Sequence, residues 1–530
     1  MTESMLVDPE SDPRATWSIS PSVTRRLVGR VRASSGQTRT TSSPSDGAPI
    51  AAVPISTVDD VRAAFVRARG AQRAWAGRPV PARAAVIRRI GEIALRRRDE
   101  ALDILQTETG KARAHAFDEV FDVAANCAWL ARKGPGILAE KRHFGVTMLG
   151  TPVREVLHPK GVIGMIAPWN YPLILTLSDA LPAWLAGNAV VLKPDSQTPL
   201  IALWAAEVTA EAGLPPELFQ VVYGSGTELG PVITDEAQHV AFTGSTATGR
   251  TVAERAARTF TGVSLELGGK NPAYVAADAD VDRAAAGLVR DCFGNTGHSC
   301  VSIERIYVHQ RVYDRFVTVF AARTRALRVG RGLDWSYDIG SISNQAQFDT
   351  ISAHVTDAVA RGARVVAGGK ARPEIGPLAY EPTVLLDVPA TATCYAEETF
   401  GPLVSVYRVG SDDEAVGRAN DTSYGLNATV WAGSGRRGRA LARRIESGTV
   451  TVNDAFPVVW SAVSSPMGGR KESGMGRRHG AAGITRYTEA QTIAVQALPL
   501  QPLYDRGGEF YGRVMTLATR ASQRTRFPWP

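Results

Sequence analysis

The sequence predicts an α/β protein with a Rossmann-type parallel sheet, a second α/β domain and a small β-rich appendage. Three observations predict this class. Short runs of β-branched residues alternate with amphipathic helices from about residue 161, and the same alternation restarts near residue 280. Strand–helix–strand units with short connections imply parallel strands covered by helices on both faces. The β-rich segments 143–160 and 485–498 lie outside both alternations, so we expect them to pair with each other.

The N-terminal part is expected to be helical after a flexible start. Residues 1–48 are rich in Ser, Thr, Pro and Arg without sustained periodicity, which favours a flexible or loosely docked arm. From about 57 to 142 the apolar residues recur with the period of an α-helix. Three helical stretches follow one another there, beginning with VDDVRAAFVRARGAQRAWA and ending near 117–132.

The same reasoning places the elements of the two alternations. In the first, we expect strands at 162–166, 188–192, 219–223, 239–243 and 262–267, with helices at 199–212, 226–234 and 246–258. In the second, we expect helices at 281–292, 312–327, 345–361 and 437–447, with strands at 304–308, 404–409 and 427–433. Ligands on parallel sheets bind at the carboxyl ends of the strands, so functional residues are expected there.

Composition excludes several classes of protein. The chain has 530 residues, of which 44% are apolar and 21% charged, which is typical of a soluble globular protein. Lys and Arg total 60 against 52 Asp and Glu, and a net charge of +8 is too dilute to favour nucleic acid as a partner. Four cysteines without a CxxC or Cys/His cluster predict neither a disulfide framework nor a metal site. A reducing compartment fits this usage.

Two segments bear on membranes and export. Residues 161–192 carry one charge and would register as a candidate span, but three prolines interrupt them, so a strand, a turn and a buried helix are expected instead. Residues 1–12 are acidic and lack an apolar core, so we expect no secretory signal and a cytoplasmic location.

Three polar residues stand out as candidate chemistry. Cys300 lies in the polar, Gly-containing loop FGNTGHSC, a setting that suits a reachable thiolate. Glu266 ends an apolar strand, where a carboxylate is rare unless it is paired or works. Asn170, in PWNYP, carries an amide that could donate to a developing oxyanion. The remaining cysteines are expected to be inert buried side chains, namely Cys127, Cys292 and Cys394.

The segment 242–251, FTGSTATGRT, follows an expected strand and opens an expected helix. Backbone N–H groups at a helix N-terminus bind phosphate, so a pyrophosphate site is one interpretation. Simple capping of the helix by Gly and Ser is the other. A triphosphate site is disfavoured because Arg250 stands where the P-loop motif has lysine.

Seven motifs in order resemble the aldehyde dehydrogenase superfamily over roughly residues 50–500. They are PWNYP (168–172), KPDSQTP (193–199), FTGS (242–245), LELGGK (265–270), FGNTGHSC (293–300), EETFGP (397–402) and PMGGRKESGMGR (466–477). Within it, the chain is most similar to the NADP-type succinate-semialdehyde dehydrogenase branch of actinobacteria. The resemblance implies NAD(P)-dependent oxidation of an aldehyde to a carboxylic acid.

The resemblance also implies roles for individual residues. The Cys300 thiolate would attack the aldehyde, the Asn170 amide and the Cys300 N–H would hold the oxyanion, and hydride would pass to the nicotinamide. Glu266 would then activate the water that hydrolyses the thioester. The residues implied to bind the cofactor are Trp169, Lys193, Ser196, Gly244, Ser245, Gly249, Glu398 and Phe400. Those implied to line the substrate pocket are Leu175, Ser178, His298, Phe456 and Trp460.

The resemblance further implies a division of the chain. Residues 49–142 and 161–268 would form the cofactor-binding domain, 269–482 the catalytic domain, and 143–160 with 483–498 an oligomerisation appendage of a homodimer or homotetramer. Residues 1–48 would be the N-terminal arm and 499–530 a basic, partly amphipathic tail. We expect this tail to pack on its own oligomer, with a partner or membrane surface as the alternative.

Several positions depart from the family pattern. Ser196 replaces a glutamate common in NAD-preferring relatives, and with Lys193 it makes room for a 2′-phosphate, which favours NADP over NAD. His298 replaces the usual glutamine and either tunes the thiolate or is a tolerated polar replacement. Arg478 stands where many relatives have a glutamate, so the proton-relay role of that glutamate is not expected in this chain. Gly294 stands where some succinate-semialdehyde enzymes have a carboxylate-binding arginine.

The substrate is therefore left with two interpretations. The branch resemblance favours succinate semialdehyde, whereas the expected pocket lining offers no cation and suits an apolar or aromatic aldehyde. Other classes remain as alternatives: a CoA-acylating dehydrogenase, a redox-silent thioesterase that uses Cys300 alone, or a binding protein on the same scaffold. The presence of Glu266 argues against the first and the cofactor motifs against the second. The dilute charge argues against the third.

Overall fold

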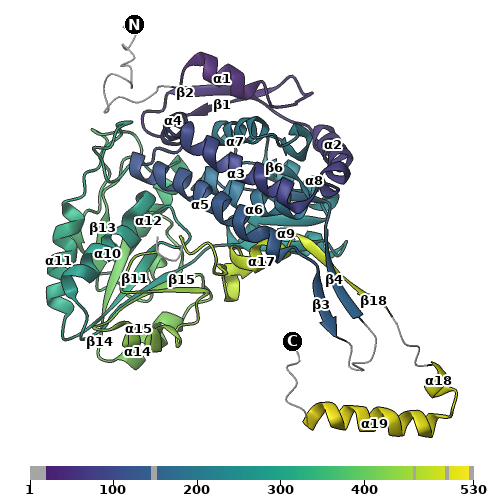
Figure 1. The fold of residues 1–530 in the computed structure, drawn as a ribbon. Coiled ribbons are helices and arrows are strands. Elements are labelled where there is room, and N and C mark those ends of the chain that lie inside the picture. Colours follow the sequence, from purple (N-terminus) through teal and green to yellow (C-terminus); the bar gives the residue numbers. More distant parts are fainter. Residues whose placement is uncertain (1–18, 145–151, 457–460, 496–500, 525–530) are drawn as a thin grey trace.

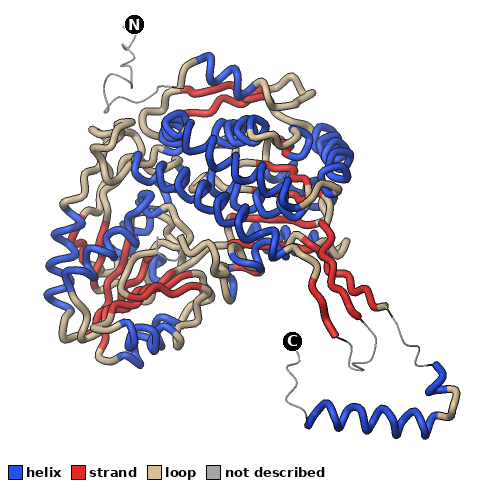
Figure 2. The backbone as a smooth tube through the Cα atoms, in the orientation of Figure 1, coloured by secondary structure: helices blue, strands red, loops and turns tan. Residues whose placement is uncertain are grey.

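The computed structural model describes residues 19–144, 152–456, 461–495 and 501–524. These residues form two units built on largely parallel sheets and two small antiparallel sheets of two and three strands (Figures 1 and 2). The α/β class predicted from the alternation of strands and helices is confirmed.

The first unit is built on a six-stranded sheet with the order β17-β9-β8-β5-β6-β7. Its strands are β5 (Val162–Ile166), β6 (Ala189–Lys193), β7 (Phe219–Val221), β8 (His239–Thr243), β9 (Gly262–Glu266) and β17 (Gly474–Met475). All neighbours are parallel except β17, which pairs antiparallel with β9. Strands β6 and β8 are buried along their whole length, because helices cover both faces of the sheet.

The helices of this unit follow the predicted periods with one exception: the second run expected before residue 110 is divided at Arg97, so four helices stand where three were expected. They are α2 (Val58–Ala76), α3 (Val80–Arg96), α4 (Arg98–Thr109), α5 (Arg113–Ile137), α6 (Pro172–Ala186), α7 (Pro199–Glu211), α8 (Gly226–Glu236) and α9 (Thr246–Ala257). The segment 161–192 consists of β5, the buried helix α6 and β6, as predicted. Among the described residues, no helix has the length and apolar character needed to cross a membrane.

The second unit has a seven-stranded sheet with the order β12-β13-β14-β11-β10-β15-β16. Its strands are β10 (Asn271–Val275), β11 (Ile303–His309), β12 (Arg364–Ala367), β13 (Thr383–Leu386), β14 (Leu403–Val409), β15 (Asn427–Trp431) and β16 (Thr449–Val452). Its helices are α10 (Val281–Phe293), α11 (Tyr313–Arg325), α12 (Gln345–Ala360), α13 (Thr393–Ala396), α14 (Asp412–Asn420) and α15 (Gly435–Ala442). Only β12 runs antiparallel to its neighbour among the pairs of this sheet that the structure describes.

The appendage is a three-stranded antiparallel sheet that projects from the body (Figure 1). It consists of β3 (Lys141–Phe144), β4 (Pro152–Pro159) and β18 (Thr488–Ala494). Strand β18 pairs with β4 from Thr488↔Pro159 to Ala494↔Val153, so the two segments expected to pair do so. The short helix α17 (Gly480–Thr485) leads into β18, and α18 (Gln501–Tyr504) and α19 (Gly508–Arg524) lie beyond it.

The prediction of a flexible arm over residues 1–48 is wrong for its second half. Helix α1 (Pro21–Val28) and strand β1 (Thr38–Ser42) lie within it, and β1 pairs antiparallel with β2 (Pro49–Pro54). Leu27 and Val53 are fully buried and join the core of the first unit. A few well-placed apolar side chains anchor a polar segment that has no repeating pattern. Residues 1–18 lie outside the described part of the chain.

Candidate active site

The candidate site lies where strands of the two units end. It is a cavity of about 280 Å³ between the carboxyl ends of β5, β8 and β9 and the loop before β11. Eight of the predicted residues line it: Trp169, Asn170, Gly244, Ser245, Glu266, Cys300, Glu398 and Phe400. Residues more than 100 positions apart in the sequence thus share one cavity, and the three candidate catalytic residues are among them.

Cys300 sits at the end of a tightly folded loop. This loop begins with the 3-10 turn Gly294–Gly297, in which Asn295 and Thr296 have φ near +55°, at 53° and 57°. Cys300 is partly exposed, whereas Cys127, Cys292 and Cys394 are buried, as predicted. Burial and then the nearby carboxyl of Glu266 raise the pKa of the Cys300 thiol to about 12. The thiol therefore needs a neighbouring base or cation to become a nucleophile.

Asn170 is held by hydrogen bonds to the same loop. Its Nδ2 donates to the carbonyl oxygen of His298 over 3.1 Å, and its own carbonyl oxygen accepts from Nδ2 of Asn295 over 3.0 Å. An amide nitrogen carries two N–H groups, so a second donor remains at the cavity wall for an oxyanion.

A buried ion pair fixes the backbone at Asn170. The Nζ atom of Lys111 donates to the Asn170 carbonyl over 2.8 Å and also to Oε1 of Glu119. The other oxygen of Glu119 accepts from the N–H groups of Leu173 and Ile174, the first turn of α6. This pair was not predicted, because Lys111 lies in the short connection between α4 and α5 and Glu119 lies in a helix that carries several other charged residues.

Glu266 ends strand β9 with its side chain buried. Its Oε1 atom has no hydrogen-bond partner among the described residues. Burial raises the pKa of the Glu266 carboxyl to about 7, and the positive charge of Arg478 opposes this rise. A carboxyl group that titrates near neutral pH is suited to act as a general base.

Lys193 and Ser196 lie at the end of β6, away from the eight cavity residues. Lys193 is buried, and its ammonium group makes no hydrogen bond or ion pair with the described residues. The carbonyl oxygen of Ser196 accepts a hydrogen bond from the Tyr223 hydroxyl over 2.8 Å, which fixes the loop after β6. A buried ammonium group without an acceptor fits a ligand that brings hydroxyl or phosphate oxygens.

The predicted phosphate segment forms a strand-to-helix turn. Ser245 is the N-cap of α9 and accepts from the N–H of Thr248. Gly249 packs against Leu267 so closely that an added Cβ would lie 2.4 Å from Leu267 Cδ2. Arg250 pairs with Glu472 at the surface, over 3.1 Å. The N-terminus of α9 thus remains open to an anion at Ser245.

Glu398 and Phe400 lie on a loop that is held in place by hydrogen bonds to Gly269 and to the buried Glu304. Oε1 of Glu398 accepts from the N–H of Gly269 over 2.8 Å. The carboxylate of Glu304 accepts from the N–H groups of Thr399 and Phe400 and pairs with buried Lys270. Sequence reasoning missed the last pair, although a glutamate within the strand-like run ERIYV is unusual.

The residues predicted to line the substrate pocket, so far as the structure describes them, do not line the cavity around Cys300. Leu175 and Ser178 lie on α6, and Phe456 lies beside Gly294, with its Cε1 atom 3.7 Å from the Cβ position of an added side chain there. Trp460 lies outside the described residues. None of these residues is among those that line the 280 Å³ cavity.

His298 is an internal packing residue. Its ring meets Trp169 edge-on at a centroid distance of 5.1 Å and stacks on Phe400 at 6.3 Å. Burial lowers the pKa of the imidazole to about 3. An uncharged ring supplies no cation to the Cys300 thiolate at neutral pH, which favours the tolerated-replacement interpretation.

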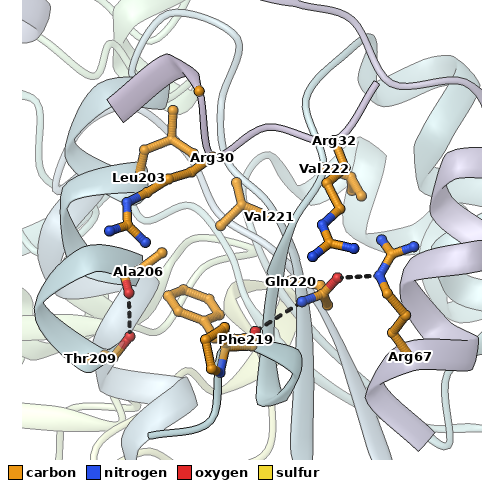
Figure 3. A pocket seen from close by; sticks show the side chains of 12 residues that line it. Arg30, Arg32, Arg67, Leu203, Ala206, Thr209, Phe219, Gln220, Val221 and Val222 are labelled. Atoms are coloured by element: carbon orange, nitrogen blue, oxygen red, sulfur yellow. Dashed lines mark hydrogen bonds between the residues drawn. The ribbon is translucent and has the colours of Figure 1, made fainter. Parts of the chain in front are cut away.

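A second cavity of about 230 Å³ lies beside edge strand β7 (Figure 3). Arg32 and Arg67 approach each other there, and Nε of Arg67 donates to Oε1 of Gln220 over 2.8 Å. None of the predicted site residues lines this cavity. The predicted catalytic residues thus line the cavity around Cys300 and not this one.

The fold is that of an α/β protein in which a cysteine, a glutamate and an asparagine line one cavity at the carboxyl ends of parallel strands. The Aldehyde dehydrogenase family model matches residues 31–493, and the chain belongs to the aldehyde dehydrogenase family. The chain is 48% identical to a Mycolicibacterium smegmatis protein provisionally named succinate-semialdehyde dehydrogenase [NADP(+)], over 90% of this chain and 93% of the relative.

Two further comparisons agree with this assignment. The succinate-semialdehyde dehydrogenase [NADP(+)] of Escherichia coli K12 is 36% identical over 87% of this chain and 95% of its own. The crystal structure of a succinate-semialdehyde dehydrogenase from Burkholderia pseudomallei is 34% identical. It superposes with a TM-score of 0.86 over 91% of this chain and 100% of its own.

Proposed function

We propose that this chain oxidises succinate semialdehyde to succinate with NADP⁺ as the hydride acceptor, as a cytoplasmic homodimer or homotetramer. The observation that carries the proposed chemistry is the meeting of Cys300, Glu266 and Asn170 in one cavity. The names of the Mycolicibacterium and Escherichia relatives support the substrate and the cofactor.

In the proposed reaction, the Cys300 thiolate attacks the carbonyl carbon of the aldehyde and a thiohemiacetal forms. The developing oxyanion is held by the free N–H of the Asn170 amide and by the Cys300 backbone N–H. After hydride loss, the acyl group remains on sulfur as a thioester. Glu266 removes a proton from water, the hydroxide attacks the thioester carbonyl, and the Cys300 thiolate leaves as the acid forms.

The dinucleotide supplies the hydride acceptor when it is bound. The chain's own residues fit it in three places. The buried Lys193 ammonium lacks an acceptor among the described residues, and Ser245 leaves the N-terminus of α9 open to an anion. Glu398 lines the cavity, where the N–H of Gly269 holds its carboxyl group. Lys193 and Ser196 would hold the adenine ribose and its 2′-phosphate, Ser245 and Trp169 the pyrophosphate, and Glu398 the nicotinamide ribose. The ring of Phe400 packs edge-on against Trp169 at 5.6 Å and walls off this end.

One observation favours a second candidate, the oxidation of an apolar or aromatic aldehyde. No lysine or arginine is among the described residues that line the cavity. Leu175 and Phe456 are apolar and Gly294 adds no side chain. The imidazole of His115, whose Nε2 atom lies 3.9 Å from the Cβ position of an added side chain at Gly294, is uncharged at neutral pH because burial lowers its pKa to about 4.

The test is formation of the reduced nicotinamide by the purified protein, followed by absorbance. We expect the highest kcat/KM with NADP⁺ and succinate semialdehyde, and a loss of at least about 10³-fold in Cys300→Ala, because no other thiol lines the cavity. Faster oxidation of apolar aldehydes would favour the second candidate. No reduction with any aldehyde and either cofactor would refute both.

A further inference from the structure

A cluster of three charged side chains is buried behind Glu266, and the reaction described above does not use it. Arg478 donates from Nε and Nη2 to the two oxygens of Asp179, over 3.1 and 2.7 Å. Arg486 pairs with Oδ1 of the same aspartate. All three side chains are at most 9% exposed. We refer to these residues as the Arg478–Asp179–Arg486 cluster.

Strand register places the cluster next to Glu266. Thr243 on β8 is the register partner of Glu266 on β9, and Nη2 of Arg478 donates to the Thr243 hydroxyl over 2.6 Å. On the other side, Gly474 of β17 is also paired with Glu266, and Arg478 follows it four residues later. Glu266 therefore lies between two strands that both connect directly to Arg478.

The cluster carries one net positive charge, since two guanidinium groups share one carboxylate. Its polar neighbours do not offset this charge. Burial lowers the pKa of His239 to about 3 and of His479 to about 4, and burial raises the pKa of Tyr487, so all three are neutral at pH 7. The Nε and Nη1 atoms of Arg486 are buried and have no hydrogen-bond partner among the described residues. The excess charge thus acts in a region from which water is largely excluded.

We propose that the Arg478–Asp179–Arg486 cluster is a fixed counter-charge that keeps the buried Glu266 carboxylate ionised, so that it can serve as the base that releases the acid. This role rests on the proposed function of Glu266. In it, the three residues are positioning residues that act through Glu266 and do not touch the substrate.

The direction of the electrostatic effects supports the proposal. Burial raises the pKa of Glu266, while Arg478, Arg486 and more weakly Arg477 lower it, and Asp179 raises it. The positive charge of Arg478 also opposes the rise in the pKa of the Cys300 thiol, to which Glu266 and Glu398 contribute. Without the cluster, the pKa of Glu266 would be higher, and a smaller share of its carboxyl groups would be ionised and able to accept a proton at pH 7.

The test is a series of variants that change the net charge of the cluster, and two measurements are made on each variant. Infrared spectroscopy follows the carboxyl titration of Glu266 directly, as the difference between each variant and its Glu266→Gln counterpart. Hydrolysis of the acyl-enzyme formed from 4-nitrophenyl acetate follows the base function without any cofactor. The titration does not depend on aldehyde oxidation, so failure of the proposal and failure of the dehydrogenase function are distinguishable.

The expected shifts follow the net charge of the cluster. Arg478→Gln, with no net charge, should raise the titration midpoint by about one pH unit and slow acyl-enzyme hydrolysis about tenfold at pH below the midpoint, with the high-pH plateau kept. Asp179→Asn should lower the midpoint. The double variant Asp179→Asn/Arg478→Gln again carries one net positive charge and should return close to the wild-type midpoint, as should Arg478→Lys.

Arg477→Gln is the matched control. Arg477 belongs to the same segment but donates to the carbonyls of Gly469 and Gly476, so its loss should move the midpoint much less than the loss of Arg478. If Arg478→Gln does not fold, Arg486→Gln replaces it with the same predicted rise. The proposal would be overturned if a folded Arg478→Gln or Arg486→Gln variant kept the wild-type titration midpoint. It would also be overturned if the double variant Asp179→Asn/Arg478→Gln kept the midpoint of Arg478→Gln.

Discussion

At the scale of single residues, the site contains a carboxyl group that is buried where its ionised form is energetically unfavourable. Glu266 has a folded-state pKa of about 7 against an ordinary value of 4.5, because burial disfavours its charge. Between these two pH values the folded protein binds more protons than the unfolded chain, so its stability falls as the pH rises. Above pH 7 the full penalty, about 3 kcal/mol, is present.

This linkage predicts an opposition between stability and activity at Glu266. Glu266→Gln should leave the free energy of unfolding unchanged at pH 4 and raise it progressively up to about pH 7, while hydrolysis of the acyl-enzyme is lost. Urea unfolding of both proteins across this pH range checks the prediction. Parallel stability profiles would show that the buried Glu266 carboxylate does not destabilise the folded protein, and the prediction would fail.

The candidate residues themselves could be predicted from the sequence. A cysteine in a polar loop, a glutamate that ends an apolar strand and an asparagine beside a proline-rich turn are local signals, and they lie together in the structure. The buried partners could not be predicted, because Lys111, Glu119, Asp179 and Arg478 acquire their roles only from contacts across more than one element. His298 shows the same limit, since its neutrality follows from burial that no motif reveals.

At the scale of elements, two loops meet backbone to backbone below the cavity. Gly297 has φ of 72°, and a Cβ added there would lie 2.2 Å from the carbonyl oxygen of Gly401. The loop that carries Cys300 and the loop that carries Glu398 and Phe400 are therefore fitted to each other. The buried Glu304 carboxylate reinforces the second loop through the N–H groups of Thr399 and Phe400.

Loss of this anchor should appear first in cofactor binding. Glu304→Gln cannot accept both loop N–H groups and Lys270 as a carboxylate does, and it leaves Lys270 buried without its counter-ion. We expect the Kd for NADP⁺, measured by quenching of tryptophan fluorescence, to rise at least about tenfold, with a fall in Tm. Glu381→Gln, which removes a partly exposed partner of Arg372, is the control. Equal effects of the two substitutions would contradict a specific role for Glu304.

The strands and helices were predictable because their periods are strong. All eight strands expected in the two alternations correspond to strands of the structure, with ends that differ by a few residues. The second half of the supposed N-terminal arm was not predictable. Its order comes from pairing with β2 and from single buried residues such as Leu27, neither of which produces a sequence period.

At the scale of the whole molecule, the appendage exposes an unpaired sheet edge. Strand β18 is the outermost strand of its sheet, six of its seven residues are exposed, and Ile493 and Val495 at its end are 43% and 55% exposed. An edge of this kind favours pairing with another chain. We propose that β18 joins the copies of this chain in the oligomer.

A pair of truncations tests this role. A chain that ends at Tyr487 lacks β18 and should elute as a monomer in size-exclusion chromatography with light scattering. A chain that ends at Val495 keeps β18 but lacks the tail, and it should retain the mass of the oligomer. If the second truncation also gives a monomer, the tail holds the oligomer together, and if neither does, the interface lies elsewhere.

The pairing of β17 with β9 also sets the order in which a newly made chain can become active. Strand β9, which ends with Glu266, is synthesised before the second unit. Gly474 of β17 and the two arginines of the cluster are synthesised only after the whole second unit. Until then β9 is an open edge and its carboxyl group has no counter-charge. The first sheet therefore gains its last strand, and Glu266 its counter-charge, only when the C-terminal segment has been synthesised.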